Sequence, residues 1–212
     1  MAGQSKDSKF YNGFGDVVDI IYIGLLWLLC CLPIVSIGPA CTAMYYTMVK
    51  CVRRGRGHVT QEFFSALRRN FWPSLKTWFI FLLLIALWLT NFIINYQADP
   101  DGLRLMGKVS TLLIIPLCFP LVWLFPYISR FDNSVGDTLK FALFISVKNF
   151  VRTVIMLLTL AAFAVLGGLF PALIPLLPGF CCLVLSLQTE PVFKTITAAF
   201  ENDGNQDQWY NE

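Results

Sequence analysis

Side chains that could carry chemistry are rare in the apolar stretches of this 212-residue chain. Asn91 and Asn95 lie one helical turn apart in the third apolar stretch, and Glu190 ends the last one. Amides at membrane depth bond to neighbouring helices or to hydroxyls of a solute, and ionisable groups there often mark coupling sites. We interpret Glu190 as a boundary residue, and Arg130 with Asp132 as an exposed ion pair that contributes little energy.

The motifs of several enzyme classes are absent. The chain has no GxxxxGKS for nucleotide phosphates, no GxSxG for a serine nucleophile and no HExxH for catalytic zinc. Its single histidine, His58, excludes a site that needs several imidazoles. The seven cysteines lie in or beside apolar stretches without CxxC spacing, so we interpret them as packing residues. We predict no catalytic residue, no cofactor and no metal, and we expect that the protein is not an enzyme.

The composition is typical of a membrane protein. Hydrophobic residues make up 57% of the chain, and the mean hydropathy is +0.65. Charged residues make up 14%, whereas soluble domains carry roughly 25%. We predict an all-α polytopic membrane helical bundle with a polar lead over residues 1–16, a single transmembrane domain over 17–200 and a polar tail over 201–212.

Six membrane spans are predicted, with five as the alternative. The difference depends on residues 36–39, because Pro33, Gly38 and Pro39 interrupt an otherwise continuous apolar stretch. Glycine accepts backbone angles that other residues avoid, and proline suits the first turn of a new helix. A hairpin at this break gives six spans, and one long broken helix gives five. The six spans are expected at residues 17–35, 39–52, 75–94, 108–127, 151–169 and 173–189.

The basic residues orient these spans. Only Arg104 and Lys108, among all lysines and arginines, fall outside the cell in the six-span arrangement. Positive charge favours the cytoplasmic side, so we expect both termini and the connectors 53–74 and 129–150 in the cytoplasm.

The connectors are expected to form amphipathic helices. In the first, apolar side chains share one helical face and Arg68 and Arg69 lie opposite, which predicts a helix in the plane of the lipid headgroups. A further amphipathic segment is expected at residues 192–200. The apolar face of the first helix consists of Phe63, Phe64, Leu67 and Phe71.

The run RRGRGH places Arg53, Arg54 and Arg56 at the end of the second span. Contact with anionic lipid is the interpretation that we favour for a basic cluster beside a span. Docking of a cytoplasmic partner is the second interpretation. Nucleic acid is not expected for so short a cluster.

The chain resembles the YesL family of small bacterial integral membrane proteins, whose biochemical function is undetermined. The resemblance rests on Leu25-Leu26-Trp27-Leu28-Leu29, Leu32-Pro33, Ile37-Gly38-Pro39-Ala40, Thr42-Ala43, Tyr45-Tyr46 and Val52-Arg53-Arg54-Gly55. It continues through Phe63-Phe64 and Phe71-Trp72 into the later apolar stretches. YesL-type proteins are similar to chains encoded beside carbohydrate ABC importers in Gram-positive bacteria.

The resemblance implies a non-catalytic accessory subunit of a carbohydrate ABC importer, in contact with its permease and ATPase subunits. Residues 60–72 and 136–150 would then be the contact surfaces. An alternative is a free-standing carrier for a neutral solute such as a sugar, with Asn91 and Asn95 facing the solute. An intramembrane enzyme is the least favoured hypothesis, since site residues are missing. The expected partner contacts are Phe63, Phe64, Arg68, Arg69, Phe71 and Lys148.

Overall fold

The apolar stretches form helices in the computed structural model, which describes residues 4–97, 119–131 and 133–200. No β-strand occurs in these ranges, in agreement with the all-α prediction. The main helices are α1 (Gln4–Cys30), α2 (Ile37–Thr47), α3 (Val59–Arg69), α4 (Phe71–Gln97), α6 (Val135–Lys148), α7 (Phe150–Leu169) and α8 (Leu177–Phe200). Shorter elements are 3₁₀ turns at Ile34–Ser36 and Pro171–Leu173, a π-helical stretch at Met48–Arg53 and an apolar helix at Phe119–Ile128.

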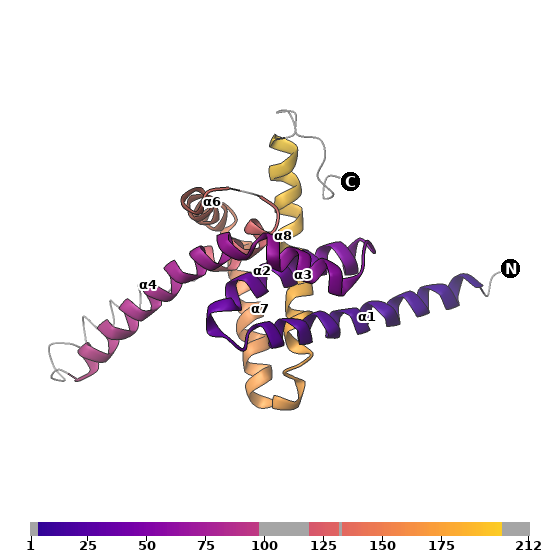
Figure 1. The fold of residues 1–212 in the computed structure, drawn as a ribbon, viewed down its shortest axis with the longest axis horizontal. Coiled ribbons are helices and arrows are strands. Elements are labelled where there is room, and N and C mark those ends of the chain that lie inside the picture. The colour runs from indigo at the N-terminus through magenta and orange to yellow at the C-terminus, as the bar shows by residue number, and fades with distance from the viewer. Residues whose placement is uncertain (1–3, 98–118, 132, 201–212) are drawn as a thin grey trace.

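Helix α2 lies at the centre of the fold. It packs against α1, α3, α4 and α8, and most of its residues are buried. Figure 1 shows α1 and α4 extending away from this centre in opposite directions. Helix α7 and the first part of α8 form a hairpin that the turn Pro171–Leu173 closes. Four of the main helices, α1, α3, α4 and α8, are therefore arranged around α2.

The chain is interrupted between the first two apolar stretches. Helix α1 ends at Cys30, and Pro33 precedes the 3₁₀ turn that leads into α2. The Ser36 hydroxyl donates hydrogen bonds to the backbone oxygens of Cys30 and Pro33. The bond to Cys30 satisfies a carbonyl group that the end of α1 leaves without a helical partner. Pro39 lies in the first turn of α2, where its missing N–H removes no helical hydrogen bond.

Gly38 acts through close packing, and the prediction that it supplies unusual backbone angles is wrong. It lies in α2, and a Cβ atom there would lie 2.6 Å from Cβ of Trp78 and 3.0 Å from the carbonyl oxygen of Ser74. Any larger residue would therefore push α2 away from α4. The left-handed conformation that favours glycine occurs instead at Gly55 and Gly57 (φ 62° and 84°), in the turn that leads into α3.

A second close crossing joins α1 to α8, which come from opposite ends of the chain. A Cβ atom on Gly179 would overlap the carbonyl oxygen of Ile20. One on Gly24 would lie 3.0 Å from the carbonyl oxygen of Pro175. Small residues at such a crossing let two helix backbones approach closely. The sequence analysis singled out neither glycine.

Two helices in the described ranges are long and apolar enough to cross a bilayer. They are Phe71–Ile93 within α4 and Phe150–Leu169, with mean hydropathies of 1.8 and 2.2. The predicted six-span bundle is therefore not confirmed. The second expected span, 39–52, is divided between α2 and the π-helical stretch. Helix α2 is only about 16 Å long at 1.5 Å per residue, and it is buried by other helices. Most of the fourth expected span, 108–127, lies outside the described residues.

The connectors differ from the prediction in three respects. Helix α3 does not stand alone in a headgroup plane, because its apolar face packs against α2 and the core. Phe71 begins α4 rather than ending the amphipathic helix, since α3 ends before Asn70. Residues 192–200 are not a separate segment, because α8 continues through Pro191. The burial of Val192 and Phe193 holds this end of α8 against the core.

Gly179→Ala is expected to destabilise the protein by about 1–3 kcal/mol, because the added methyl group overlaps the backbone of α1. Gly168→Ala is the matched control, since nothing lies within 4 Å of a Cβ atom there. The control is expected to be neutral or to raise the stability by up to about 1 kcal/mol. Thermal unfolding of both purified variants in mild detergent measures the difference. Equal stability would contradict the close crossing.

Candidate functional site

Arg130 and Glu190 form an ion pair in the interior of the protein. Their side chains are 2% and 5% exposed, and Nη2 of Arg130 donates to both carboxylate oxygens of Glu190 at 2.5 Å. Charged side chains are rarely buried, since desolvation offsets much of the attraction between them. The prediction of an exposed pair between Arg130 and Asp132 is therefore wrong for Arg130, and Asp132 lies outside the described residues.

Neighbouring polar and aromatic groups complete the environment of this pair. The Tyr45 hydroxyl donates to Oε1 of Glu190 at 3.0 Å and lies 2.6 Å from Oγ1 of Thr189. The Arg130 guanidinium lies over the ring of Phe193, 5.3 Å from its centroid, as a cation–π contact requires. We call Tyr45, Arg130, Thr189 and Glu190 the buried polar cluster.

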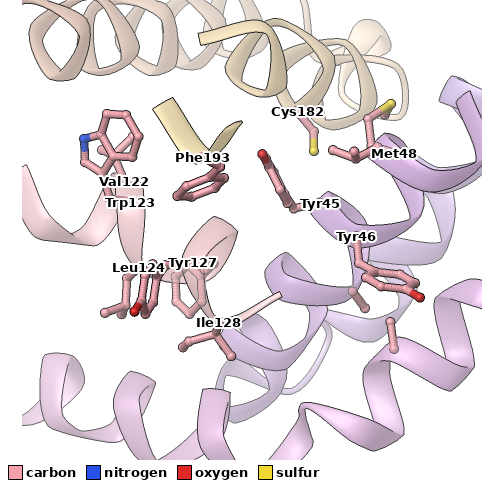
Figure 2. Packing of buried hydrophobic residues seen from close by; sticks show 14 of the residues in the cluster. Tyr45, Tyr46, Met48, Val122, Trp123, Leu124, Tyr127, Ile128, Cys182 and Phe193 are labelled. Carbon is pink, nitrogen blue, oxygen red and sulfur yellow. The ribbon is translucent and has the colours of Figure 1, made fainter. Parts of the chain in front are cut away.

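Three segments that are distant in sequence build this cluster. Tyr45 comes from α2, Thr189 and Glu190 come from α8, and Arg130 lies in the turn after the helix Phe119–Ile128. In that turn, the backbone N–H groups of Arg130 and Phe131 both donate to the carbonyl oxygen of Tyr127. Figure 2 shows Tyr45 and the α8 residue Phe193 among the buried side chains of the same core.

A basic cluster, defined here as Lys50, Arg53, Arg54 and Arg56, follows α2. Nη1 of Arg53 donates to the carbonyl oxygen of Ser186 on α8 at 2.9 Å. Burial, and then the positive charge of nearby Arg130, lower the pKa of Arg54 from its ordinary value. The basic cluster thus lies against α8 next to the buried polar cluster.

Lys50 is held by a carboxylate on α3. Its Nζ atom lies 2.8 Å from Oε2 of Glu62 and 3.2 Å from the hydroxyl of Tyr46. Partial burial lowers the pKa of Lys50, but hydrogen bonds to Glu62 and Tyr46 outweigh that effect and raise it above its ordinary value. This pair fixes the start of α3 against the π-helical stretch.

An apolar cavity of about 570 Å³ adjoins the buried polar cluster, because Tyr45 belongs to that cluster and also lines the cavity. This volume lies in the range of about 300–1,000 Å³ typical of small-molecule sites. Its walls come from α1, α2, α4, α7, α8 and the helix Phe119–Ile128, and they are almost wholly apolar. Examples of lining residues are Trp27, Trp78, Phe125, Leu157, Phe163 and Leu185.

The cavity can enclose an apolar molecule. The charged groups of Arg130 and Glu190 face each other. In the described ranges, no three His, Cys, Asp or Glu side chains are placed to hold a metal ion. The thiol of Cys41 in the cavity wall accepts a hydrogen bond from Nε1 of Trp27 at 3.3 Å. An apolar cavity of this size can bind an apolar molecule.

The predicted contact residues are divided between the core and the surface. Phe63 is wholly buried, so it cannot contact a partner, and the prediction for this residue is wrong. Phe64 is 42% exposed, and Arg68 is exposed. Arg69 is exposed with its guanidinium over the ring of Tyr46, 5.2 Å from the centroid.

The remaining predicted residues lie on other helices. Phe71 is half-buried at the start of α4, and Lys148 is exposed at the end of α6. Asn91 is exposed on α4 and does not line the cavity. The side chain of Asn95 lies outside the described residues. The structure therefore does not bring Asn91 to the cavity.

Sequence reasoning missed the buried polar cluster. The available signal was a pair of opposite charges, Arg130 and Glu190, each at the edge of an apolar stretch. Sixty positions separate them, and neither residue shares a short motif with the other or with Tyr45. The pairing therefore depends on how α8 packs against the turn at Arg130.

The described ranges contain two membrane-length helices. Comparison with known proteins finds that part of the chain matches an uncharacterised family. The model of that family, described as a protein of unknown function, DUF624, matches residues 20–92. The matched stretch includes α2, α3, most of α4, Tyr45 and the basic cluster, but neither Arg130 nor Glu190. No curated protein and no solved structure matches the chain.

Glu190→Gln is expected to destabilise the protein by about 3–5 kcal/mol, because it leaves Arg130 buried without its counter-charge. Adding Arg130→Met should restore most of the loss, since no buried charge then remains. Lys140→Gln is the control, because Lys140 and Asp137 form an exposed pair at 3.9 Å, and a change within about 0.5 kcal/mol is expected. Thermal unfolding followed by circular dichroism in mild detergent measures all three. A loss no larger than that of the control would refute the buried pair.

Phe63 and Phe64 offer a second test, since these neighbours differ in burial. Phe63→Ala removes a side chain from the core and should cost about 3–5 kcal/mol of stability. Phe64→Ala changes a side chain that is 42% exposed and should stay within about 1 kcal/mol. Unfolding midpoints in one detergent compare the two variants. A larger loss for Phe64→Ala would mean that α3 is rotated relative to this structure.

Proposed function

We propose that the protein is a multi-pass cell-membrane protein that serves as a non-catalytic accessory subunit of a carbohydrate ABC importer. The sequence looks like the YesL family, whose members are similar to chains encoded beside such importers, and the match to an uncharacterised family over residues 20–92 is consistent with this resemblance. In the proposal, α3 and α6 contact the permease and ATPase subunits on the cytoplasmic side.

The distribution of basic residues supports this orientation. Arg68 and Arg69 immediately precede α4, and Lys148 and Arg152 flank the start of α7. Basic residues concentrate at the cytoplasmic ends of membrane spans. The N-terminal ends of both membrane-length helices, and with them α3 and α6, would then lie in the cytoplasm.

The arrangement of α3 and α6 is the observation that carries the proposal. The two helices are distant in sequence, yet both pack on α4. Figure 1 places them away from the turn that joins α7 to α8. Helix α3 presents Phe64 and Arg68 outward, and α6 presents an apolar face. Exposed apolar patches beside charged residues are typical of protein contacts. The exposed apolar residues of α6 include Phe141, Leu143, Phe144 and Val147.

The alternative of a sugar carrier receives less support from the geometry. A sugar site needs several convergent hydrogen-bonding groups, because each hydroxyl must replace its bonds to water. The described cavity is lined almost wholly by apolar side chains, and Asn91 does not line it. The carrier hypothesis stays a prediction that uptake by proteoliposomes containing this chain alone would test.

Arg68→Glu is expected to abolish co-purification of the importer subunits, because it reverses a charge at the proposed contact without touching the core. The measurement is a mild-detergent pull-down of the tagged protein from its native membrane, with mass spectrometry of the captured chains. Lys194→Glu, at an exposed position on α8, is the control and should retain the partners.

Two outcomes would overturn the proposal. One is that the unmodified protein captures no permease and no ATPase under conditions that keep known importers intact. The other is that Arg68→Glu and Phe64→Ala both capture these subunits in the same ratio as the unmodified protein.

A further inference from the structure

The cavity and the basic cluster are neighbours along two helices. On α8, Leu177, Cys181 and Leu185 line the cavity at intervals of four residues. The next residue, Ser186, accepts the hydrogen bond from Arg53. On the other side, α2 lines the cavity through Tyr45 and continues into the π-helical stretch, which carries Lys50 and Arg53 and is followed by Arg54 and Arg56. Both α2 and α8 thus lead from the apolar cavity to the arginines.

We propose that this cavity holds an acyl chain of an anionic phospholipid, whose phosphate is bound by Arg53 and Arg54. The cavity wall includes part of α7, which is long and apolar enough to cross a bilayer. Leu160 and Ala164 line the cavity from α7 and are also exposed at its surface. The cavity therefore opens along a helix whose natural surroundings are lipid tails.

The charges near one end of the cavity favour an anionic headgroup. Burial, and then the nearby charge of Arg130, lower the pKa of Arg54, while Glu190 raises it and is itself bonded to Arg130 and Tyr45. A phosphate at this end of the cavity would lie beside the guanidinium groups of Arg53 and Arg54. Guanidinium groups bind phosphate through paired hydrogen bonds. A zwitterionic lipid would gain less, because its headgroup carries its own cation. The inference does not depend on the proposed association with an importer.

Photo-crosslinking in vesicles tests the site. The full chain is reconstituted into phosphatidylcholine vesicles that contain a trace of phosphatidylglycerol with a diazirine in its acyl chain. A second sample carries the same diazirine on phosphatidylcholine. Mass spectrometry then locates the adducts. We expect adducts of the anionic probe on the cavity walls of α2 and α8, and weaker labelling of these walls by the zwitterionic probe.

Two variants on α7 distinguish the cavity from the general lipid surface. Ala164→Trp fills the cavity and should remove the adducts on α2 and α8. Ala161→Trp is the matched control, because Ala161 is exposed on the same helix and does not line the cavity. Equal melting temperatures of the two variants establish that the effect is not misfolding.

A third variant separates the headgroup from the chain. Arg53→Gln with Arg54→Gln should reduce labelling of the cavity by the anionic probe by roughly thirtyfold, as expected for the loss of two cations near an anionic lipid. Adducts confined to the outer faces of α4 and α7, unchanged by Ala164→Trp, would overturn the proposal. Equal labelling of the cavity by both probes would overturn it as well, because the site would then not recognise an anion.

Discussion

The buried ion pair between Arg130 and Glu190 is the constraint on which the centre of this fold depends. Two charges inside a protein are tolerated only when they meet each other and when neighbouring groups satisfy their remaining hydrogen bonds. Tyr45 supplies such a bond from α2, and Phe193 lies against the guanidinium from α8. The position of α8 relative to α2 is therefore coupled to the polar groups that the two helices share with the turn at Arg130.

The contact between α2 and α8 positions both the cavity and the basic cluster. Tyr45 lines the cavity, and its hydroxyl bonds to Glu190, so the cavity and the buried charges meet at this residue. Directly after the cavity residue Leu185, Ser186 on α8 accepts a backbone hydrogen bond from Arg53. An apolar cavity that ends beside arginines is complementary to a phospholipid, which has apolar acyl chains and a phosphate in its headgroup. This correspondence is the basis of the proposed lipid site.

The sequence predicted the parts of the fold that depend on local composition. The helical class, the interruption near Pro33 and the apolar stretches of α4 and α7 follow from periodicity, proline positions and hydropathy. The amphipathic pattern of α3 was visible too, but the prediction of what covers its apolar face was wrong. Phe63 packs in the protein core, because a helical pattern indicates that one face is buried without indicating by what.

The candidate site could not be predicted, for the same physical reason. Glu190 and Arg130 are 60 positions apart, and each alone is consistent with a charge at the edge of a membrane span. The sequence around Gly179 and Gly38 does not indicate which helix backbones these glycines allow to approach each other. The sequence by itself determined a chain of apolar helices with a basic cluster after the second apolar stretch. Only the tertiary structure decided which charges are buried together, which helices cross at glycine and where a cavity remains, because these features depend on contacts between distant segments.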